Sequence, residues 1–460
     1  MNPRLLGLIA FIEGFASLGI EVIALRRLVP HLGSSISVTA PTIGLFLLAL
    51  SLGYWQGGRV STQELRRVGI NFAIAGAVAG VGLSAAATDL IFRAATDPWV
   101  GYLCFMAAVV CPSAWCLAQT VPLLANLMGG AGAGRASGLA LTASTFGSVL
   151  GAVSLSWGVM QTLGVGAAVL ACAGSLGLAA AAGAAAQRRW WPAVALALGV
   201  AGLAVLNLHT SPAGALQSAY ADYRVGTLAP EAAARAGLRP PVRQFQVNQQ
   251  RASQLDAGSP PRRAAYIERM HQHLVDLRQW RGQDILVLGA GGFTLSLQDP
   301  ANRYTYVDID PRIREVAQDQ FLKAPVQGRF VAEDARRYVV QTPQRYRAVV
   351  VDVYSAHASV PAHLVTLEFW RSLPRVLEPE GLVLVNLILD SRLQSAYARN
   401  LLATVEAGLG RCATEVLAPA APVSNVLLAC QPGGAPEPAP ASIYTDELNR
   451  VDLDRSRLGY

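Results

Sequence analysis

Long apolar runs fill roughly the first two hundred residues of the chain, and shorter apolar runs separated by polar segments fill the remainder. A bilayer core takes about twenty apolar residues per helix. The first run is too long for the apolar part of a signal peptide, so we expect a retained membrane helix. The candidate membrane helices lie at 5–26, 36–57, 70–94, 99–124, 138–160, 165–186 and 190–207. The first half is therefore predicted to be a transmembrane domain of about seven helices.

The second half shows the pattern of an α/β fold. Short apolar strands alternate with longer helical segments, which predicts a Rossmann-like, doubly wound, mostly parallel seven-stranded sheet. No helix separates the last two strands, so we expect them to form an antiparallel hairpin at one edge. The expected strands are 284–289, 304–308, 328–332, 347–353, 381–388, 412–418 and 424–430, and the main helices are 311–321, 362–377 and 391–409. This is the layout of nucleoside-dependent methyltransferases.

These patterns divide the chain into four parts. Residues 1–207 form the integral membrane domain, and residues 244–431 form the α/β domain. Between them, 208–243 is rich in Ala, Pro and Arg with weak periodicity, which is typical of a linker. The last part, 432–460, is a tail whose proline-rich start at 432–440 is expected to be loose.

Composition agrees with a membrane half. Only 15% of residues are charged, against roughly 25% in soluble proteins. The net charge is +7 and the pI about 9.2. No cluster of Lys or Arg with interleaved aromatic residues appears, so basic character here does not indicate nucleic acid. Arginines flanking membrane helices account for it.

Six cysteines fall into two groups. Cys104, Cys111, Cys116 and Cys172 lie in apolar helices, where we expect small buried side chains. Cys111 and Cys116 lack the spacing of a zinc site. A contact between Cys412 and Cys430 in the last two strands is possible, but the spacings do not indicate a disulfide framework.

Three segments of the α/β half carry the pattern of an adenosine pocket. An apolar strand runs from Asp284 into the glycine turn Gly289-Ala-Gly-Gly, and about twenty residues later a second strand ends at Asp308. A third strand ends at Asp334. Glycines let the backbone approach a nucleoside, and an acid at the end of the second strand can bind ribose hydroxyls.

Other polar residues of this half are weaker candidates. Asp310, which precedes Pro311, is expected to cap a helix rather than to bind a ligand. Asp352 ends an apolar strand at the carboxyl edge of the sheet, where we favour a general base over a loop cap. His357 is a better candidate proton carrier than His363. His271 and His273 do not share a helix face, so we expect no metal site.

From about 244 to 431 the chain resembles the spermidine synthases, a family of aminopropyltransferases. The resemblance rests on Leu288-Gly-Ala-Gly-Gly, Val307-Asp-Ile-Asp-Pro, Glu333-Asp-Ala, Val351-Asp-Val-Tyr-Ser and Tyr266-Ile-Glu, in the order of that family. The first half, with Phe11-Ile-Glu-Gly-Phe and Ile20-Glu-Val, looks like the membrane region of bacterial membrane-fused members.

The resemblance implies roles for individual residues. Asp308 would bind ribose hydroxyls, Asp334 with its neighbour Glu333 would meet adenine, and Gly289 and Gly291 would allow backbone approach to the sulfonium end. Asp352 would take a proton from the attacking amine. Tyr266 would line the acceptor site, with Glu268 beside it. The cosubstrate would be S-adenosylmethionine or its decarboxylated form, the acceptor a polyamine, and a homodimer is one possible assembly.

Three positions depart from the family pattern. The acid that holds the aminopropyl ammonium group is replaced by Gly292, a second acid by Ser355, and a polar residue by Ile267. Because a buried cation without an anion is unfavourable, these changes leave other functions open. They are an S-adenosylmethionine lyase or cyclase releasing methylthioadenosine without an amine, and a methyltransferase with a membrane acceptor.

A nonenzymatic function is also open. Glu13 and Glu21 lie in the first membrane helix, eight residues apart and within about 80° of each other around it. Intramembrane carboxylates are costly and default to a functional hypothesis. They would fit a polar pathway through the bundle, with the α/β domain acting as a nucleoside sensor of a transporter. The alternative is that they lie near an interface or pair with Arg26, Arg27 or hydroxyl groups.

The arginine pattern and the expected chemistry disagree about topology. Arg59, Arg66, Arg67, Arg135, Arg188 and Arg189 lie on the side of Arg4, with only Arg26, Arg27 and Arg93 on the other. The positive-inside rule puts the first group in the cytoplasm, and seven helices would then place the α/β domain outside it. Because adenosyl cosubstrates are cytoplasmic, we expect instead an inner-membrane protein with a cytoplasmic enzyme domain.

Overall fold

The structure, a computed structural model, describes residues 3–33, 36–60, 62–127, 133–209, 215–354, 360–432 and 443–456. These residues form two compact units. A helical unit holds 1–32, 38–213 and 217–219, and an α/β unit holds 220–460 with two short pieces at 33–37 and 214–216.

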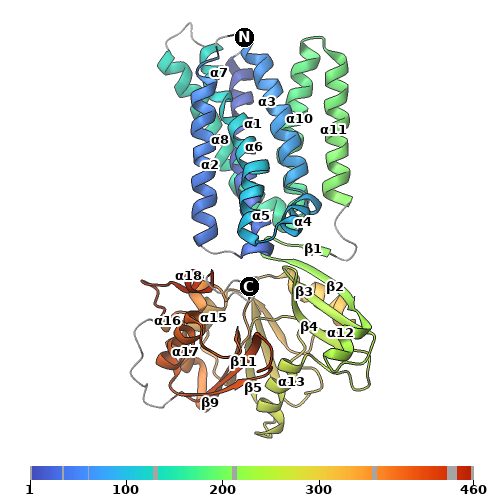
Figure 1. The fold of residues 1–460 in the computed structure, drawn as a ribbon, viewed down its shortest axis with the longest axis vertical. Coiled ribbons are helices and arrows are strands. Elements are labelled where there is room, and N and C mark those ends of the chain that lie inside the picture. Colours follow the sequence, from blue (N-terminus) through green and yellow to red (C-terminus); the bar gives the residue numbers. More distant parts are fainter. Residues whose placement is uncertain are drawn as a thin grey trace. The chain divides into compact units, whose positions relative to one another are not determined.

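The helical unit consists of long apolar helices packed side by side (Figure 1). Among the residues that the structure describes, six helices are long and apolar enough to cross a bilayer, or seven if one bent pair counts as a single crossing. The elements are α1 (Pro3–Leu32), α2 (Ile36–Gly57), α3 (Glu64–Gly82), α4 (Ala85–Ala94), α5 (Pro98–Phe105), η1 (Met106–Val110), α6 (Cys111–Ala118), α7 (Thr120–Leu127), α8 (Ala133–Val153), η3 (Ser154–Val159), α9 (Met160–Thr162), α10 (Val165–Ala186) and α11 (Trp190–His209).

The third predicted helix, 70–94, is wrong as a single element. It is the bent pair, in which α3 and α4 meet at an angle of 69°. The break falls at Ser84, whose hydroxyl oxygen accepts a hydrogen bond from the backbone N–H of Ala87 and so caps the start of α4. A serine at this position favours a helix start over helix continuation. The predicted segment at 99–124 lies within one candidate span, Pro98–Leu127, whose hydrogen bonding changes between α-helical and π-helical along α5, η1, α6 and α7.

Helices α1 and α8 pack with their backbones in contact. A Cβ atom added to Gly14 would lie 1.8 Å from the carbonyl oxygen of Ser144, and one added to Gly147 would lie 2.1 Å from that of Phe11. Small residues at a helix interface allow this close approach. At the same seam the Ser144 hydroxyl donates to the Glu13 carboxylate at 2.6 Å. Glu13 is 1% exposed and Glu21 8%, so both acids face the bundle interior.

The segment predicted as a linker, 208–243, contains regular structure instead. Strands β1 (Ala215–Gln217), β2 (Asp222–Leu228), β3 (Val242–Val247) and β4 (Gln250–Asp256) form a four-stranded sheet in that order, with α12 (Pro230–Arg235) between β2 and β3. Its strands are short and mix apolar residues with Arg, Gln and other polar residues, so the sequence contains no apolar run that would predict them. Tyr223 and Phe245 stack and are buried against the rest of the α/β unit.

The large sheet has seven strands in the order β10-β11-β9-β8-β5-β6-β7. Strands β5 to β9 are parallel, and β11 runs antiparallel to both β9 and β10. The predicted mostly parallel sheet with an antiparallel hairpin is therefore present. The strands are β5 (Asp284–Leu288), β6 (Arg303–Asp308), β7 (Arg329–Ala332), β8 (Tyr346–Val351), β9 (Leu377–Asp390), β10 (Cys412–Val416) and β11 (Val423–Cys430).

Helices cover both faces of this sheet (Figure 1). Alternate residues of β5 point to opposite faces: Leu286 packs into one core and Val287 into the other. Burial on both faces is why these strands read as continuous apolar runs. One face carries α15 (Ala335–Gln341), η6 (Ala362–Leu364), α16 (Leu367–Ser372), η7 (Leu373–Val376), α17 (Ala396–Leu409) and α18 (Val451–Ser456), and the other α13 (Ala265–His271), η4 (Gln272–Asp276), α14 (Arg312–Val316) and η5 (Ala317–Leu322).

The expected tail at 432–460 is only partly a tail. Tyr444 is 2% exposed, its backbone carbonyl accepts from Leu367, and its hydroxyl donates to Asp454. Residues 443–456 therefore pack onto the α/β unit, with Tyr444 and Val451 in its core. The prediction that 432–440 is loose falls almost wholly outside the described residues.

The close contact of α1 and α8 at Gly14 and Gly147 predicts how a larger side chain there changes the stability of the protein. Gly147→Leu should separate α1 from α8 and lower the stability of the detergent-solubilised protein by about 3 kcal/mol, because the new side chain would meet backbone that cannot move aside. Gly138→Leu on the same helix is the control, since nothing lies within 4 Å of its Cβ position. Thermal unfolding in detergent measures both. Equal melting temperatures for the two variants would contradict the seam.

Candidate functional site

Three neighbouring strands end at one edge of the sheet and bring the candidate acids together there. Strands β8, β5 and β6 are adjacent and parallel. Asp308 is the last residue of β6, the glycine turn follows β5, and Asp352 follows β8 directly. The carboxyl edge of an open parallel sheet is where such folds bind ligands.

The turn after β5 requires glycine at its first position. Gly289 has a φ of +90°, and a Cβ atom there would lie 2.2 Å from the carbonyl oxygen of Asp352. Its N–H donates to Val307 at 2.9 Å, and the N–H of Asp352 donates to Leu288 at 2.9 Å. Gly291 has a φ of +49°. The predicted glycine turn is confirmed, and it holds β5 against both acid-bearing strands.

The Asp308 carboxylate is bound by a backbone N–H of that turn and by one just after β6. One oxygen accepts from the N–H of Ala290 and the other from the N–H of Asp310, each at 3.0 Å. Burial raises its pKa to about 6, and the backbone donors act in the opposite direction. Each oxygen keeps a lone pair for another donor, so the geometry suits a vicinal diol such as a ribose.

Asp310 has the structural role that its sequence context predicts. One carboxylate oxygen accepts from the N–H of Arg312 at 2.9 Å, at the start of α14. The other accepts from the hydroxyl of Tyr223 at 2.7 Å. Asp310 is 1% exposed. Because Tyr223 lies on β2, this hydrogen bond ties the small sheet to the end of β6.

Asp334 and Glu333 are both engaged with protein groups. Asp334 caps α15 by accepting from the N–H of Arg337 at 2.9 Å, and its second oxygen lies 2.9 Å from Nε2 of His363. The hydrogen bond from His363 holds the pKa of Asp334 below its ordinary value. The Glu333 carboxylate pairs with the Arg337 guanidinium at 3.1 Å. An adenine amino group could share the His363-bound oxygen of Asp334. The Glu333 side chain is instead paired with Arg337 of the following helix, α15.

Two side-chain amides that were not predicted from the sequence, Asn386 and Asn425, form a hydrogen-bonded chain that ends at the Asp352 carboxylate. Asn386 on β9 donates from Nδ2 to Asp352 at 2.8 Å, and its Oδ1 accepts from Asn425 on β11 at 3.0 Å. Burial raises the pKa of Asp352 to about 6, with hydrogen bonds from Asn386 and Tyr266 acting to lower it. Asn386 is 3% exposed. Its signal in the sequence was a lone amide inside the apolar run Leu382–Leu389.

Tyr266 lies close to Asp352, and its role at an acceptor site stays a prediction. Its hydroxyl donates to the backbone carbonyl of Ala252 at 2.7 Å. Burial and the neighbouring Asp352 carboxylate raise the pKa of Tyr266 well above its ordinary value, so it remains a neutral donor. Glu268 is directed elsewhere, since its carboxylate pairs with Arg263 at 3.2 Å.

The space beside Gly292 is closed to any side chain. A Cβ atom at this position would lie 2.6 Å from the Phe321 ring and 2.7 Å from Cβ of Ser253. The N–H of Gly292 donates to the Ser253 hydroxyl at 3.0 Å. No carboxylate could therefore be restored here without moving η5 or β4. Ser355 and His357 lie outside the described residues.

Histidine ligands do not converge in the parts of the α/β unit that the structure describes. No three His, Cys, Asp or Glu side chains there lie close enough to hold a metal ion. His271 is 7% exposed, and burial lowers its pKa. His273 lies 3.4 Å from Glu415.

A separate hollow of about 520 Å³ lies at the opposite edge of the sheet. It is lined by the first residues of β5, β6 and β7, among them Asp284 and Arg303, which pair with each other at 2.7 Å. Since the glycine turn and the buried carboxyls are at the carboxyl edge, we assign ligand binding to that edge and not to this hollow.

The arrangement at the carboxyl edge suits two tasks. Asp308 offers two fixed acceptors next to a backbone that can approach a nucleoside closely. Asp352 has a pKa near neutrality, as a proton acceptor needs. A titratable carboxyl beside a glycine turn at the carboxyl edge of a parallel sheet is a candidate site on physical grounds.

Comparison with known proteins gives matches of fold only. No protein-family profile and no curated protein sequence matches the chain. Among solved structures, the chain is similar to a probable spermidine synthase from Corynebacterium glutamicum (20% identity, 48% of this chain and 81% of that one, TM-score 0.39). It is also similar to spermidine synthase from Thermotoga maritima (11%, 52% and 81%, 0.35) and to the N-methyltransferase NodS from Bradyrhizobium japonicum (17%, 37% and 98%, 0.27).

The raised pKa of Asp352 predicts a pH-dependent effect on stability. Its carboxyl ionises near pH 3.8 when unfolded and near pH 6 when folded, so stability is lost as the pH rises through 6. Asp352→Asn should therefore stabilise the protein at pH 8, by at most about 3 kcal/mol, and change little at pH 4. Thermal unfolding at both pH values measures this. The exposed Asp319→Asn is the control, and an equal effect of Asp352→Asn at both pH values would contradict the burial argument.

Proposed function

We propose that the α/β domain binds an S-adenosyl compound at the carboxyl edge of its sheet and catalyses group transfer from the sulfonium centre, as an aminopropyltransferase-like enzyme. One observation carries this proposal: a glycine turn lies between a backbone-bound carboxyl, Asp308, and a second carboxyl of near-neutral pKa, Asp352. The first suits a ribose and the second suits a nucleophile that must lose a proton.

The proposed reaction is a displacement. An amine nitrogen forms a bond to the carbon beside the sulfonium sulfur, the carbon–sulfur bond breaks, and its electron pair stays on sulfur to give methylthioadenosine. Asp352 takes the proton from the nitrogen, and the neutral Tyr266 hydroxyl, which donates to the Ala252 carbonyl, lines the acceptor site beside it. Asn386 keeps the Asp352 carboxylate oriented, because its own amide is fixed by Asn425. Holding the two reactants in line is the main contribution of the protein.

The closed space at Gly292 favours a second candidate, a lyase acting on S-adenosylmethionine. An aminopropyl ammonium group would find no carboxylate there, because Phe321 and Ser253 occupy the space that an acidic side chain would need. In the lyase reaction the carboxylate of the substrate itself attacks the carbon beside sulfur and forms a lactone. The carbon–sulfur bond breaks and methylthioadenosine leaves, without an amine acceptor and without net proton transfer.

Product analysis with the full-length protein in detergent separates the candidates. It is incubated with S-adenosylmethionine or its decarboxylated form, with and without putrescine. Methylthioadenosine formed only with the amine supports transfer, and methylthioadenosine without it supports the lyase. S-adenosylhomocysteine would indicate a methyltransferase. Binding without turnover would indicate a sensor, and neither binding nor turnover would contradict an adenosyl site.

Replacing Asp308 should weaken ligand binding, whereas replacing Asp352 should lower turnover. Asp308→Ala removes the ribose acceptors and should weaken methylthioadenosine binding by about 2 kcal/mol, or roughly thirtyfold. Asp352→Asn should keep that affinity and lose turnover by at least about a hundredfold. Calorimetric titration and product formation measure the two effects. Full activity of Asp352→Asn, or unchanged affinity of Asp308→Ala, would remove the corresponding assignment.

Asn386 should act through the pKa of Asp352. Asn386→Leu deletes a hydrogen bond to the ionised carboxylate, worth about 1.5–3 kcal/mol, so the acidic limb of the pH–rate profile should move up by about one unit or more. A packing defect alone would lower the rate equally at every pH. Asn425→Leu should give a smaller shift in the same direction. If the acidic limb of the pH–rate profile stays at the same pH in Asn386→Leu, Asn386 does not position Asp352.

A further inference from the structure

The compartment of the α/β domain can be inferred from the helical unit and one disulfide. The last helix, α11, separates the Arg188–Arg189 pair from the α/β domain in the chain. Its stretch Trp190–Leu208 is long and apolar enough to cross a bilayer, with a mean hydropathy of 1.9. If α11 crosses, the domain follows on the side opposite to these two arginines.

Contacts within the helical unit define its two ends. At one end, Asn126 near the end of α7 donates to the carbonyl of Val60, in the connection between α2 and α3. At the other end, Asn207 of α11 donates to Gly80 near the end of α3. Arg27 of α1 donates there too, to Leu83. Helix α3 thus joins the two ends, and its 19 residues reach about 28 Å, close to the thickness of a bilayer core.

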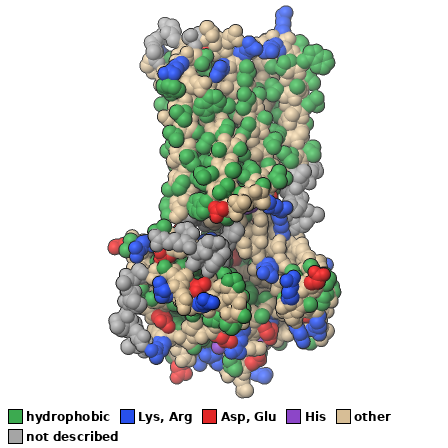
Figure 2. Space-filling view, in the orientation of Figure 1, with side chains coloured by type: hydrophobic (Ala, Val, Ile, Leu, Met, Phe, Trp, Pro, Cys, Tyr) green, Lys and Arg blue, Asp and Glu red, His purple; other side chains and the backbone are tan. Residues whose placement is uncertain are grey.

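Exposed arginines gather at the first of these ends (Figure 2). By chain order and the contacts above, this end carries Arg4, Arg59, Arg66, Arg67, Arg135, Arg188 and Arg189.

The other end is poor in free positive charge. Arg26 and Arg27 are 7% and 5% exposed and donate to the backbone carbonyls of Ser218 and Leu83, so they act as structural donors. Arg93 is exposed and pairs with Asp89 at 3.6 Å. Since arginine bias sets the orientation of membrane helices, the arginine-rich end is the cytoplasmic one.

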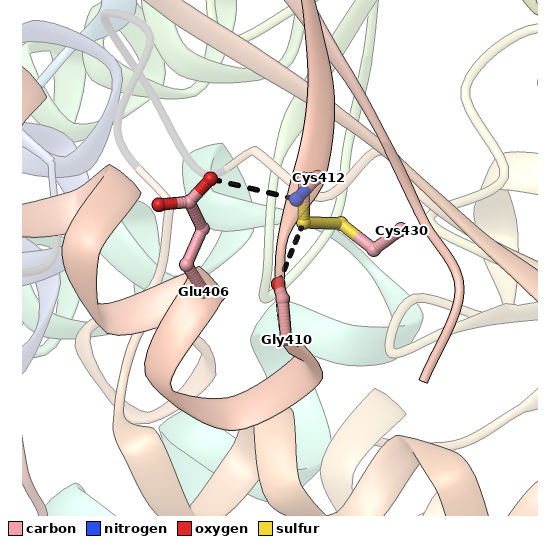
Figure 3. Close-up of a disulfide and its surroundings, with 4 residues drawn as sticks. All are labelled: Glu406, Gly410, Cys412 and Cys430. Carbon is pink, nitrogen blue, oxygen red and sulfur yellow. Dashed lines mark hydrogen bonds between the residues drawn. A yellow bond between two sulfur atoms is a disulfide. The ribbon is translucent and has the colours of Figure 1, made fainter. Parts of the chain in front are cut away.

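A disulfide gives an independent indication. Cys412 and Cys430 occupy directly paired positions of β10 and β11 and form a disulfide bond (Figure 3). Both sulfurs belong to buried residues, with Cys430 0% exposed and Cys412 8%. The remaining four cysteines all lie in the helical unit and are free. Structural disulfides persist in oxidising compartments such as the bacterial periplasm and are rare in the cytoplasm.

We propose that the α/β domain lies on the extracytoplasmic side of the membrane, with the arginine-rich end of the helical unit in the cytoplasm. This reverses the orientation expected from cosubstrate supply. Its consequence is that an adenosyl ligand must reach the site from outside the cytoplasm or be carried across the bilayer. In the second case, a transport step for a nucleoside-bearing cation would precede the reaction at this site.

Cysteine labelling in cells tests the orientation with the full chain. Glu380→Cys lies on an exposed part of the α/β domain, and Arg189→Cys at the arginine-rich end. Spheroplasts are treated with a membrane-impermeant maleimide before and after lysis, with the unmodified chain as background. We expect Glu380→Cys to be labelled before lysis and Arg189→Cys only after it. The reverse pattern would overturn the proposal.

The redox state of the disulfide gives a second readout. Cells are quenched with acid, and the protein is alkylated with a maleimide polymer before and after reduction. We expect two further adducts only after reduction, and none of them in a Cys412→Ser, Cys430→Ser variant. Both adducts without reduction would contradict an oxidising location. Because neither measurement uses activity, failure here leaves the proposed adenosyl site untouched, and failure of that site leaves the orientation untouched.

Discussion

Two backbone N–H groups hold the Asp308 carboxyl against the glycine turn, and the candidate site is organised around this contact. A carboxyl taken partly out of water is unfavourable unless donors replace the water. Ala290 and Asp310 supply them, and the Ala290 N–H is brought to Asp308 by a turn in which Gly289 adopts a positive φ and lies against the Asp352 carbonyl. The same turn therefore fixes the position of both acids. A side chain at residue 289 would disturb the two at once.

The core of the α/β domain could be predicted because its strands are buried on both faces and so are continuously apolar. The glycine turn and the acids at strand ends followed from the same reading. The small sheet could not be predicted, since β2 to β4 mix apolar residues with Arg, Gln and other polar residues and contain no continuous apolar run. The bend after Leu83 was missed because its sequence is apolar on both sides of Ser84. The Cys412–Cys430 pair depends on the register of β10 and β11, which spacing does not reveal.

Only the part of the site that lies at strand ends could be predicted from the sequence. Residues next to strand ends can be placed from the strand pattern, and Asp308 and Asp352 lie at the ends of β6 and β8, as that pattern predicts. Asn386 and Asn425 lie within strands, and their link to Asp352 depends on the strand order β8-β9-β11. Gly292 could be recognised as a missing acid, but the filling of its space by Phe321 required the position of η5. The amide chain and the closed space together are what distinguish this site from a simple diamine site.

The most direct test of the central claim is a structure of the full-length protein determined with methylthioadenosine. The account predicts density at the carboxyl edge of the large sheet, with both ribose hydroxyls within hydrogen-bond distance of the Asp308 carboxylate and the sulfur directed toward Asp352. Density confined to the hollow lined by Asp284 and Arg303, or an empty edge at saturating ligand, would contradict it.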